Sequence, residues 1–157
     1  MIKAIPEEYN SVTPIFTFKD ALKAIEFYKR AFGARERFVM PGPDGKGVMH
    51  AELQIGDSII MMGEENPENQ CKSAESLGVS PVSFYLYLEN VDEAFRVAVA
   101  AGAEVRMPVQ EMFWGDRAGT VQDPFGYSWF LASHTRDLTM EEIRQGAQAM
   151  FAEMKGK

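Results

Sequence analysis

The chain has few of the residues that mark several protein classes. Among its 157 residues there are two histidines and a single cysteine, Cys71, which cannot form a disulfide within the chain. This favours a reducing, cytoplasmic location. The 16 basic residues are outnumbered by 23 acidic ones, and the net charge of −7 argues against nucleic acid as a partner. No apolar run approaches the ~20 residues of a membrane span, and the start MIKAIPEEYN is not expected to be a signal peptide.

What is present is a pattern of strands and helices that occurs twice. Residues 12–18 alternate as a strand buried on one face, and the helix that follows carries an apolar stripe. The stripe consists of Leu22, Ile25, Tyr28 and Phe32, and Gly33 ends the helix. Three further strands are expected at 35–40, 48–55 and 58–62.

The second half repeats this order. A strand at 82–88 precedes a helix that ends near Gly102. Three strands follow at 103–109, 118–122 and 127–133, the last one after the turn DPFG, which has the residues of a type I turn. Gly33-Ala34 and Gly102-Ala103 are 69 residues apart, and such self-similarity is a strong indication of a repeated unit.

These elements predict an α+β fold in one structural domain. Two βαβββ modules, 11–62 and 82–134, are expected to form curved mixed sheets around a cleft, with a polar linker at 63–81. A C-terminal helix is expected at 138–155 because Thr139 and Glu142 form a capping box. Its apolar stripe must pack either on this chain or on a partner.

Paired βαβββ modules with D-P-x-G before the last strand resemble the vicinal oxygen chelate superfamily. This group includes glyoxalase I, extradiol dioxygenases, fosfomycin-resistance enzymes and bleomycin-resistance proteins. The stretches VTPIFTFKDALKAIEFYKRAFGA, PGPDGKGVMHAELQIGDSIIMM, SPVSFYLYLENVDEAF and MPVQEMFWGDRAGTVQDPFGYSWFLASH are similar to its PhnB-like subgroup and cover nearly all of 11–134. Together with the terminal apolar stripe, the resemblance implies a homodimer.

The resemblance also implies where a metal would be held. Metal-binding members carry one ligand on the first and one on the last strand of each module. The corresponding residues here are Thr13, Met61, Ser83 and Phe130. None of them is a good ligand for a divalent cation, which requires carboxylate or imidazole groups. We therefore expect no metal and no cofactor.

Strand alternation predicts which side chains line the cleft. In VMHAELQI the set Met49, Ala51, Leu53 and Ile55 should face the helix. His50 and Glu52 should then face the cleft, where they are the candidate acid–base pair, although solvated sheet residues are an equally good interpretation. The ligand-binding candidates are Thr13, Gln54, Met61, Ser83, Tyr85, Tyr87, Trp114, Gln122 and Phe130.

Other polar residues receive structural interpretations. Asp116 and Arg117 are expected to fix the loop FWGDR, and His134 is expected to be exposed beyond the last strand. Cys71 has no histidine near it in sequence, which argues against a cysteine nucleophile.

Three functions remain open at this point. The first is a metal-independent binding protein that holds an unknown small molecule, cationic or aromatic, in the inter-module cleft. The second is an isomerase, lyase or dioxygenase with a non-standard site around His50 and Glu52. The third is a non-catalytic interaction module. Fold alone does not choose among them.

Overall fold

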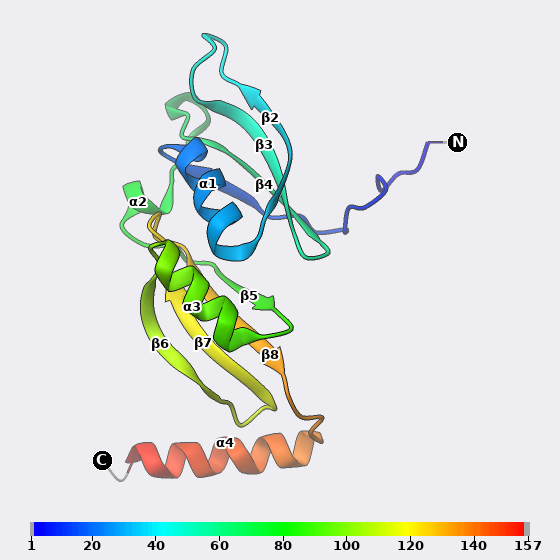
Figure 1. The fold of residues 1–157 in the computed structure, drawn as a ribbon, viewed down its shortest axis with the longest axis vertical. Helices are drawn as coiled ribbons and strands as arrows, with labels where there is room; N and C mark the ends of the chain where they lie inside the picture. The colour runs from blue at the N-terminus through cyan, green and yellow to red at the C-terminus, as the bar shows by residue number, and fades with distance from the viewer. Residues whose placement is uncertain (1, 156–157) are drawn as a thin grey trace.

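The computed structural model describes residues 2–155 and contains two modules with the same order of elements (Figure 1). The first comprises β1 (Ile15–Phe18), α1 (Ala21–Phe32), β2 (Arg35–Pro41), β3 (Val48–Ile55) and β4 (Ser58–Glu64). The second comprises β5 (Ser83–Tyr87), α3 (Val91–Ala101), β6 (Glu104–Glu111), β7 (Asp116–Gln122) and β8 (Ser128–His134). A helix, α4 (Met140–Lys155), follows, so the predicted fold class is confirmed.

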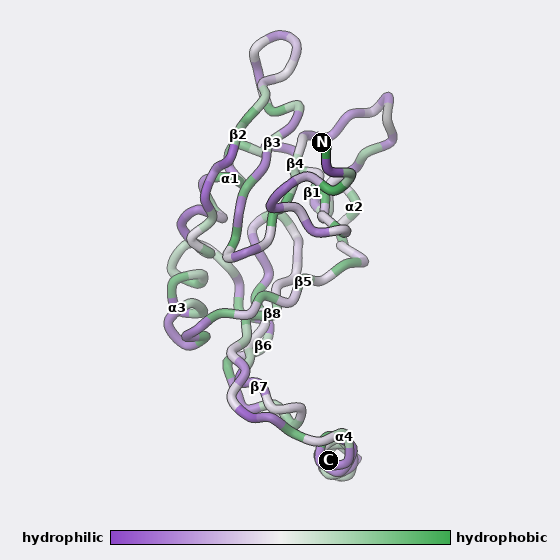
Figure 2. The backbone as a smooth tube through the Cα atoms, turned by 90° about the vertical axis from the view of Figure 1, so that its right-hand side faces the viewer, coloured by the Kyte–Doolittle hydropathy of each residue, from purple (hydrophilic) through white to green (hydrophobic). Residues whose placement is uncertain are grey.

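Each module forms a four-stranded mixed sheet. The strand orders are β1-β4-β3-β2 and β5-β8-β7-β6, with β1 parallel to β4 and β5 parallel to β8. The other neighbouring strands are antiparallel. Helices α1 and α3 lie on the same side of the molecule and pack on one another (Figure 2).

Helix α1 begins and ends at the residues that its sequence predicts. The Asp20 side chain accepts a hydrogen bond from the Lys23 backbone N–H, and Gly33 takes the left-handed conformation at φ 63°. Ile25, Tyr28 and Phe32 are buried as expected. Leu22 was wrongly placed in the buried stripe: it is exposed, and Phe27 fills the core in its place.

One apolar core joins the modules. Phe16 of β1 packs against Phe84 of β5, with ring centroids 4.4 Å apart, and against Trp129 of β8 at 5.8 Å. The sheet faces turned away from this core remain partly open in the single chain, as the exposed side chains of Ile15, Tyr85 and Tyr87 show.

The DPFG turn ties the two modules together. The Gly126 N–H donates to the Asp123 carbonyl, which closes the predicted turn. The buried Asp123 carboxylate accepts from the Tyr28 hydroxyl of α1 at 2.6 Å and from Trp129 Nε1 at 3.0 Å. Burial raises the pKa of the Asp123 carboxyl despite these bonds. Asp123 is therefore a structural residue that connects both halves.

The segment between the modules is not extended coil throughout. It includes the end of β4, a 3₁₀ turn η1 (Pro67–Asn69) and a short helix α2 (Ala74–Leu77). Ser73 caps α2, and both its backbone N–H and its hydroxyl donate to Glu65. These bonds lower the pKa of the Glu65 carboxyl to about 2.

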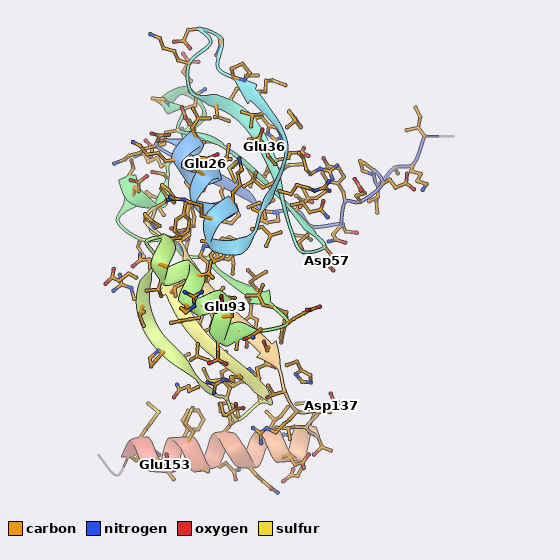
Figure 3. The ribbon with its side chains drawn as sticks, in the orientation of Figure 1. Glu26, Glu36, Asp57, Glu93, Asp137 and Glu153 are labelled. Carbon is orange, nitrogen blue, oxygen red and sulfur yellow. The ribbon has the colours of Figure 1, made fainter. Side chains whose placement is uncertain are left out.

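Helix α4 crosses the end of the second module beyond the turn between β6 and β7 (Figure 1). Gly146 lies against Phe113, and a Cβ at that position would approach the Phe113 Cβ to 2.9 Å. The far half of the helix, which Glu153 marks in Figure 3, carries exposed Met150, Phe151 and Met154. Among residues 2–155, no helix is long and apolar enough to cross a membrane.

Candidate functional site

The expected site residues form two groups, one on each sheet. The first group consists of Thr13 before β1, His50, Glu52 and Gln54 on β3, and Met61 on β4. The second consists of Ser83, Tyr85 and Tyr87 on β5, Trp114 in the turn before β7, Gln122 on β7, and Phe130 on β8. Met61 pairs with Ile15 and Glu52, while Phe130 pairs with Tyr85 and Thr120. Each group is therefore a surface of its own sheet.

Strand β3 presents its side chains largely as predicted. Ala51, Leu53 and Ile55 are buried, which turns His50, Glu52 and Gln54 to the opposite face. Met49 was wrongly expected to face the helix and is exposed. The cause is a register shift between Met40 and Pro41 of β2, which interrupts the alternation at this end of the sheet.

Glu52 is the carboxylate at the centre of the first group, and its side chain is only 7% exposed. The Tyr9 hydroxyl donates to its Oε2. Arg37 Nε lies 3.5 Å from the same oxygen, and His50 Nε2 lies 3.4 Å from Oε1. The hydrogen bond to Glu52, together with partial burial, raises the pKa of the Tyr9 phenol and keeps it a donor. We refer to Arg37, His50 and Glu52, against which Tyr9 lies, as the Glu52 site.

Arg37 reaches Glu52 because of a β-bulge. Glu36 pairs with Leu53 and Phe38 pairs with Glu52, so Arg37 is the extra residue of β2. Bulges redirect a side chain in this way. Among the described residues, Arg37 Nε is a buried nitrogen without a hydrogen-bond partner, so its contact with Glu52 is an ion pair. Neither Arg37 nor Tyr9 was expected from the sequence, because alternation does not show a bulge and Tyr9 lies outside any periodic segment.

A pocket of about 440 Å³ opens beside His50. It lies between the β2–β3 loop and the segment after β4, and its lining includes Ile15, Thr17, Lys46, His50, Glu64 and Cys71. Cys71 and His50, which are far apart in sequence, lie in the wall of the same pocket, and the interpretation of Cys71 as not a nucleophile stays a prediction. Apolar walls with a few polar groups are typical of small-molecule sites.

Asp116 is the corresponding hub of the second sheet and is 2% exposed. Its Oδ2 accepts from Tyr85 Oη at 2.8 Å, from Tyr87 Oη at 3.0 Å and from Trp114 Nε1 at 3.0 Å. Burial alone would raise the pKa of the Asp116 carboxyl, but the hydrogen bonds from His134 and these three side chains lower it overall. Tyr85, Tyr87, Trp114, Asp116 and His134 are the Asp116 cluster.

His134 differs from its expected position. It is the last residue of β8 and pairs with Asp116, because β7 begins two residues earlier than predicted. Its ring is half exposed, as expected, but Nδ1 lies 2.8 Å from Asp116 Oδ1 and Nε2 lies 2.9 Å from Asp137 Oδ1. The hydrogen bond to Asp116 raises the pKa of His134 most, and the hydrogen bond to Asp137 raises it further. Figure 3 labels Asp137 at the junction between β8 and α4.

The two expected glutamines make matching contacts at the sheet edges. Gln54 Oε1 accepts from Arg35 at 2.5 Å, and Gln122 Oε1 accepts from Arg106. Each amide nitrogen donates to a backbone carbonyl, that of Gly56 and that of Gly126 respectively. Both glutamines therefore hold strand ends, and their role in ligand binding stays a prediction.

The donor set does not fit a resident metal. Of the four positions that the resemblance indicates, Phe130 offers no donor atom and Met61 offers only a thioether. The Thr13 hydroxyl donates to the Asn10 carbonyl, at 3.5 Å. Within residues 2–155, no group of three or more His, Cys, Asp or Glu side chains is placed to hold a metal ion. The chemistry of the Glu52 site is that of a carboxylate, an imidazole and a guanidinium.

Comparison with known proteins places these features in a family. The chain is 39% identical over 137 residues to the uncharacterised protein Mb0911c of Mycobacterium bovis, covering 85% of this chain and 90% of that protein. The structure of TioX from Micromonospora sp. ML1 is 25% identical with a TM-score of 0.63, covering 83% of this chain and all of TioX.

A third similarity concerns the fold alone. A PhnB protein from Bacillus cereus, described as a putative 3-demethylubiquinone-9 3-methyltransferase, is 20% identical with a TM-score of 0.61. The match covers 79% of this chain and 99% of that protein. Residues 12–131 match the family model itself, and the chain therefore belongs to the Glyoxalase/Bleomycin resistance protein/Dioxygenase superfamily.

Proposed function

We propose that this chain is a metal-independent small-molecule binding protein and that the Glu52 site is the centre of its binding surface. The observation that carries the proposal is the nearly buried Glu52 carboxylate, which contacts Tyr9, Arg37 and His50. Of these, His50 lines a pocket of about 440 Å³. A volume of this size suits a small organic ligand. A cytoplasmic location remains part of the proposal.

The ligand is expected to be aromatic or cationic. The acidic balance of the chain favours cations in general. Exposed rings favour aromatic compounds: Tyr85 stacks on Phe130 with centroids 5.6 Å apart, and Tyr87 lies 5.1 Å from Tyr85. Stacking on such rings contributes about 0.5–1.5 kcal/mol beyond the burial of area.

We further propose a homodimer in which a second copy covers the open sheet faces and completes an inter-module cleft. The support is the exposure of Ile15, Tyr85 and Tyr87 on these faces and of Phe151 on α4. The Tyr85 and Tyr87 rings lie 5.1 Å apart, and patches of exposed apolar side chains mark interaction surfaces. Light scattering at micromolar concentration should give twice the chain mass of 17.6 kDa. A mass of 17.6 kDa would contradict the dimer.

A catalytic role is the second candidate, and it rests on the contact between His50 and Glu52. The two side chains approach to 3.4 Å, and the imidazole is about one-third exposed towards the pocket. A histidine that is oriented by a carboxylate can take or give a proton. The same site would then act on its ligand as well as bind it.

The decisive experiment is a ligand screen by thermal shift, followed by titration of variants. His50→Ala and Glu52→Gln should weaken the binding of any hit at least about tenfold, whereas Glu93→Gln on the outer face of α3 is the matched control and should not. Unchanged affinity in both site variants would refute the proposal. Turnover of a hit that is lost in His50→Ala would favour the enzyme.

Metal independence has its own measurement. Elemental analysis of the dialysed protein should find well under one equivalent of zinc, iron, nickel or manganese per chain, because Thr13, Met61, Ser83 and Phe130 do not form a ligand set. Ligand affinity should also be unchanged after treatment with a chelator. One retained equivalent of metal per chain would refute this part of the proposal.

A further inference from the structure

The segment before β1 lies against the Glu52 site. Residues 2–10, which we call the N-terminal strap, place the Tyr9 hydroxyl on Glu52 and the Tyr9 ring beside Arg37. The Arg37 guanidinium carbon is 5.6 Å from the ring centroid, a cation–π distance. Arg37 Nη1 also donates to Glu8 at 2.9 Å. One aromatic ring that carries a hydroxyl group therefore already occupies the site.

The strap is held by few contacts. Its hydrogen bonds and ion pairs to the sheet come from Glu8 and Tyr9, whereas the bond from Lys3 to Glu7 lies within the strap. Glu8 has φ 71°, a left-handed conformation that costs a non-glycine residue of order 1 kcal/mol. Every residue of the strap other than Tyr9 is exposed. Local opening of such a segment is expected to cost little free energy.

The groups of the Glu52 site restrict what can replace Tyr9. At the place of the Tyr9 hydroxyl, a ligand anion would meet the Glu52 carboxylate, and a ligand cation would have to share that carboxylate with Arg37, whose Nε lies 3.5 Å from the same oxygen. A neutral hydroxyl on an aromatic ring satisfies both, because the hydroxyl donates to the carboxylate and the ring face receives the guanidinium. We propose that the Glu52 site binds phenols and that Tyr9 is an internal competitor which such a ligand displaces. This inference rests on the proposed binding function and narrows it to one chemical class.

Competition by Tyr9 has a measurable consequence. If a ligand binds only when the strap is open, its apparent Kd is the intrinsic Kd divided by the fraction of molecules in which the strap is open. Removing the Tyr9 side chain should therefore increase the affinity for a phenol. The increase should be larger for a ligand that can donate a hydrogen bond than for one that cannot, since only the former takes the bond from Tyr9 to Glu52.

The test is a titration with 4-fluorophenol, followed by fluorine NMR, with 4-fluoroanisole as the probe that lacks the donor. Tyr9→Ala should bind 4-fluorophenol about tenfold more tightly than the unmodified chain, with Tyr9→Phe between them. Glu52→Ala, which removes the acceptor, should abolish the preference for phenol over anisole. Glu7→Gln, a strap variant that does not touch the site, is the matched control and should bind like the unmodified chain.

A second measurement uses the unmodified chain. Saturating 4-fluorophenol should speed amide hydrogen exchange in residues 2–10 and slow it in β3, whereas 4-fluoroanisole should do neither. Equal affinity of all Tyr9 variants, or exchange unchanged by phenol, would overturn the inference. If phenols fail while another screened compound still depends on His50 and Glu52, only this inference falls. If no compound depends on them, the proposed function falls as well.

Discussion

Each sheet carries one central buried carboxylate, Asp116 or Glu52, and the two differ in which parts of the chain donate hydrogen bonds to them. Asp116 receives its hydrogen bonds from β5, from the β6–β7 turn and from the end of β8, all of them parts of the second module. Glu52 receives its hydroxyl donor from a strap outside the sheet. The difference indicates which carboxylate can exchange its hydrogen-bond donor. The donors of Asp116 are fixed within the second module, whereas the hydroxyl donor of Glu52 comes from the N-terminal strap, which few contacts hold.

The repeat makes this contrast sharper. Arg37 and Arg106 are both the extra residue where the second strand of their module bulges. In the first module, the third strand carries Glu52, which pairs with Met61. In the second module, the residue that pairs with Phe130, the equivalent of Met61, is Thr120. Arg106 turns instead to Gln122 and Glu104. The β3 position that carries a carboxylate in the first module therefore carries a hydroxyl in the second.

The largest expected effect separates the two carboxylates by stability. Asp116→Ala removes the acceptor of four donors and should lower the free energy of unfolding by about 3 kcal/mol, which corresponds to a melting temperature lower by about 6–12 °C. Glu52→Ala should cost less than about 1 kcal/mol, since Tyr9 lies on an exposed segment and Arg37 keeps its ion pair with Glu8. Denaturant titration of both variants measures the difference. Equal losses would remove the distinction between the two sites.

A smaller effect should appear as a dependence on pH. The raised pKa of His134 means that its stabilising contact is fully present below its unfolded value, about 6.5, and is lost as pH rises through the folded value. The lowered pKa of Asp116 means that its contribution is present above about 3.9 and is lost in more acidic solution. His134→Ala should therefore reduce the melting temperature most between about pH 4 and 6.5.

The Asp116→Ala background provides the control for this pH dependence. With the main partner of His134 removed, His134→Ala should produce a much smaller change between pH 5 and pH 8 than it does in the unmodified chain. The same pH-dependent loss in both backgrounds would show that His134 acts through another group.

The smallest expected effect concerns the two bulge arginines. Arg37→Ala and Arg106→Ala should each change the melting temperature by no more than about 2 °C, because both side chains are partly exposed. Only Arg37→Ala should alter the binding of 4-fluorophenol. Equal effects of the two variants on binding would mean that the second module contributes to the site as much as the first.

The sequence predicted the repeat, the order of elements along the chain and the face of β3 that carries His50 and Glu52. Periodicity reports which face of a strand is buried. The sequence did not predict the position of Met49 or the role of Arg37. Both depend on irregular pairing between β2 and β3, which alternation cannot show. The contact between His134 and Asp116 was missed because it needs both strands to extend by one or two residues, the least certain part of any prediction from sequence.

Tyr127, next to the DPFG turn, bears on how copies of this chain can meet. Its hydroxyl donates to the Thr17 carbonyl at 2.8 Å and accepts from the Thr17 N–H at 3.3 Å. One phenol thus occupies both backbone groups of a residue on β1, the outermost strand of its sheet. An exposed outer strand invites a neighbouring chain to extend the sheet and aggregate. By occupying the backbone groups of Thr17, Tyr127 disfavours the addition of a strand from a neighbouring chain at this point.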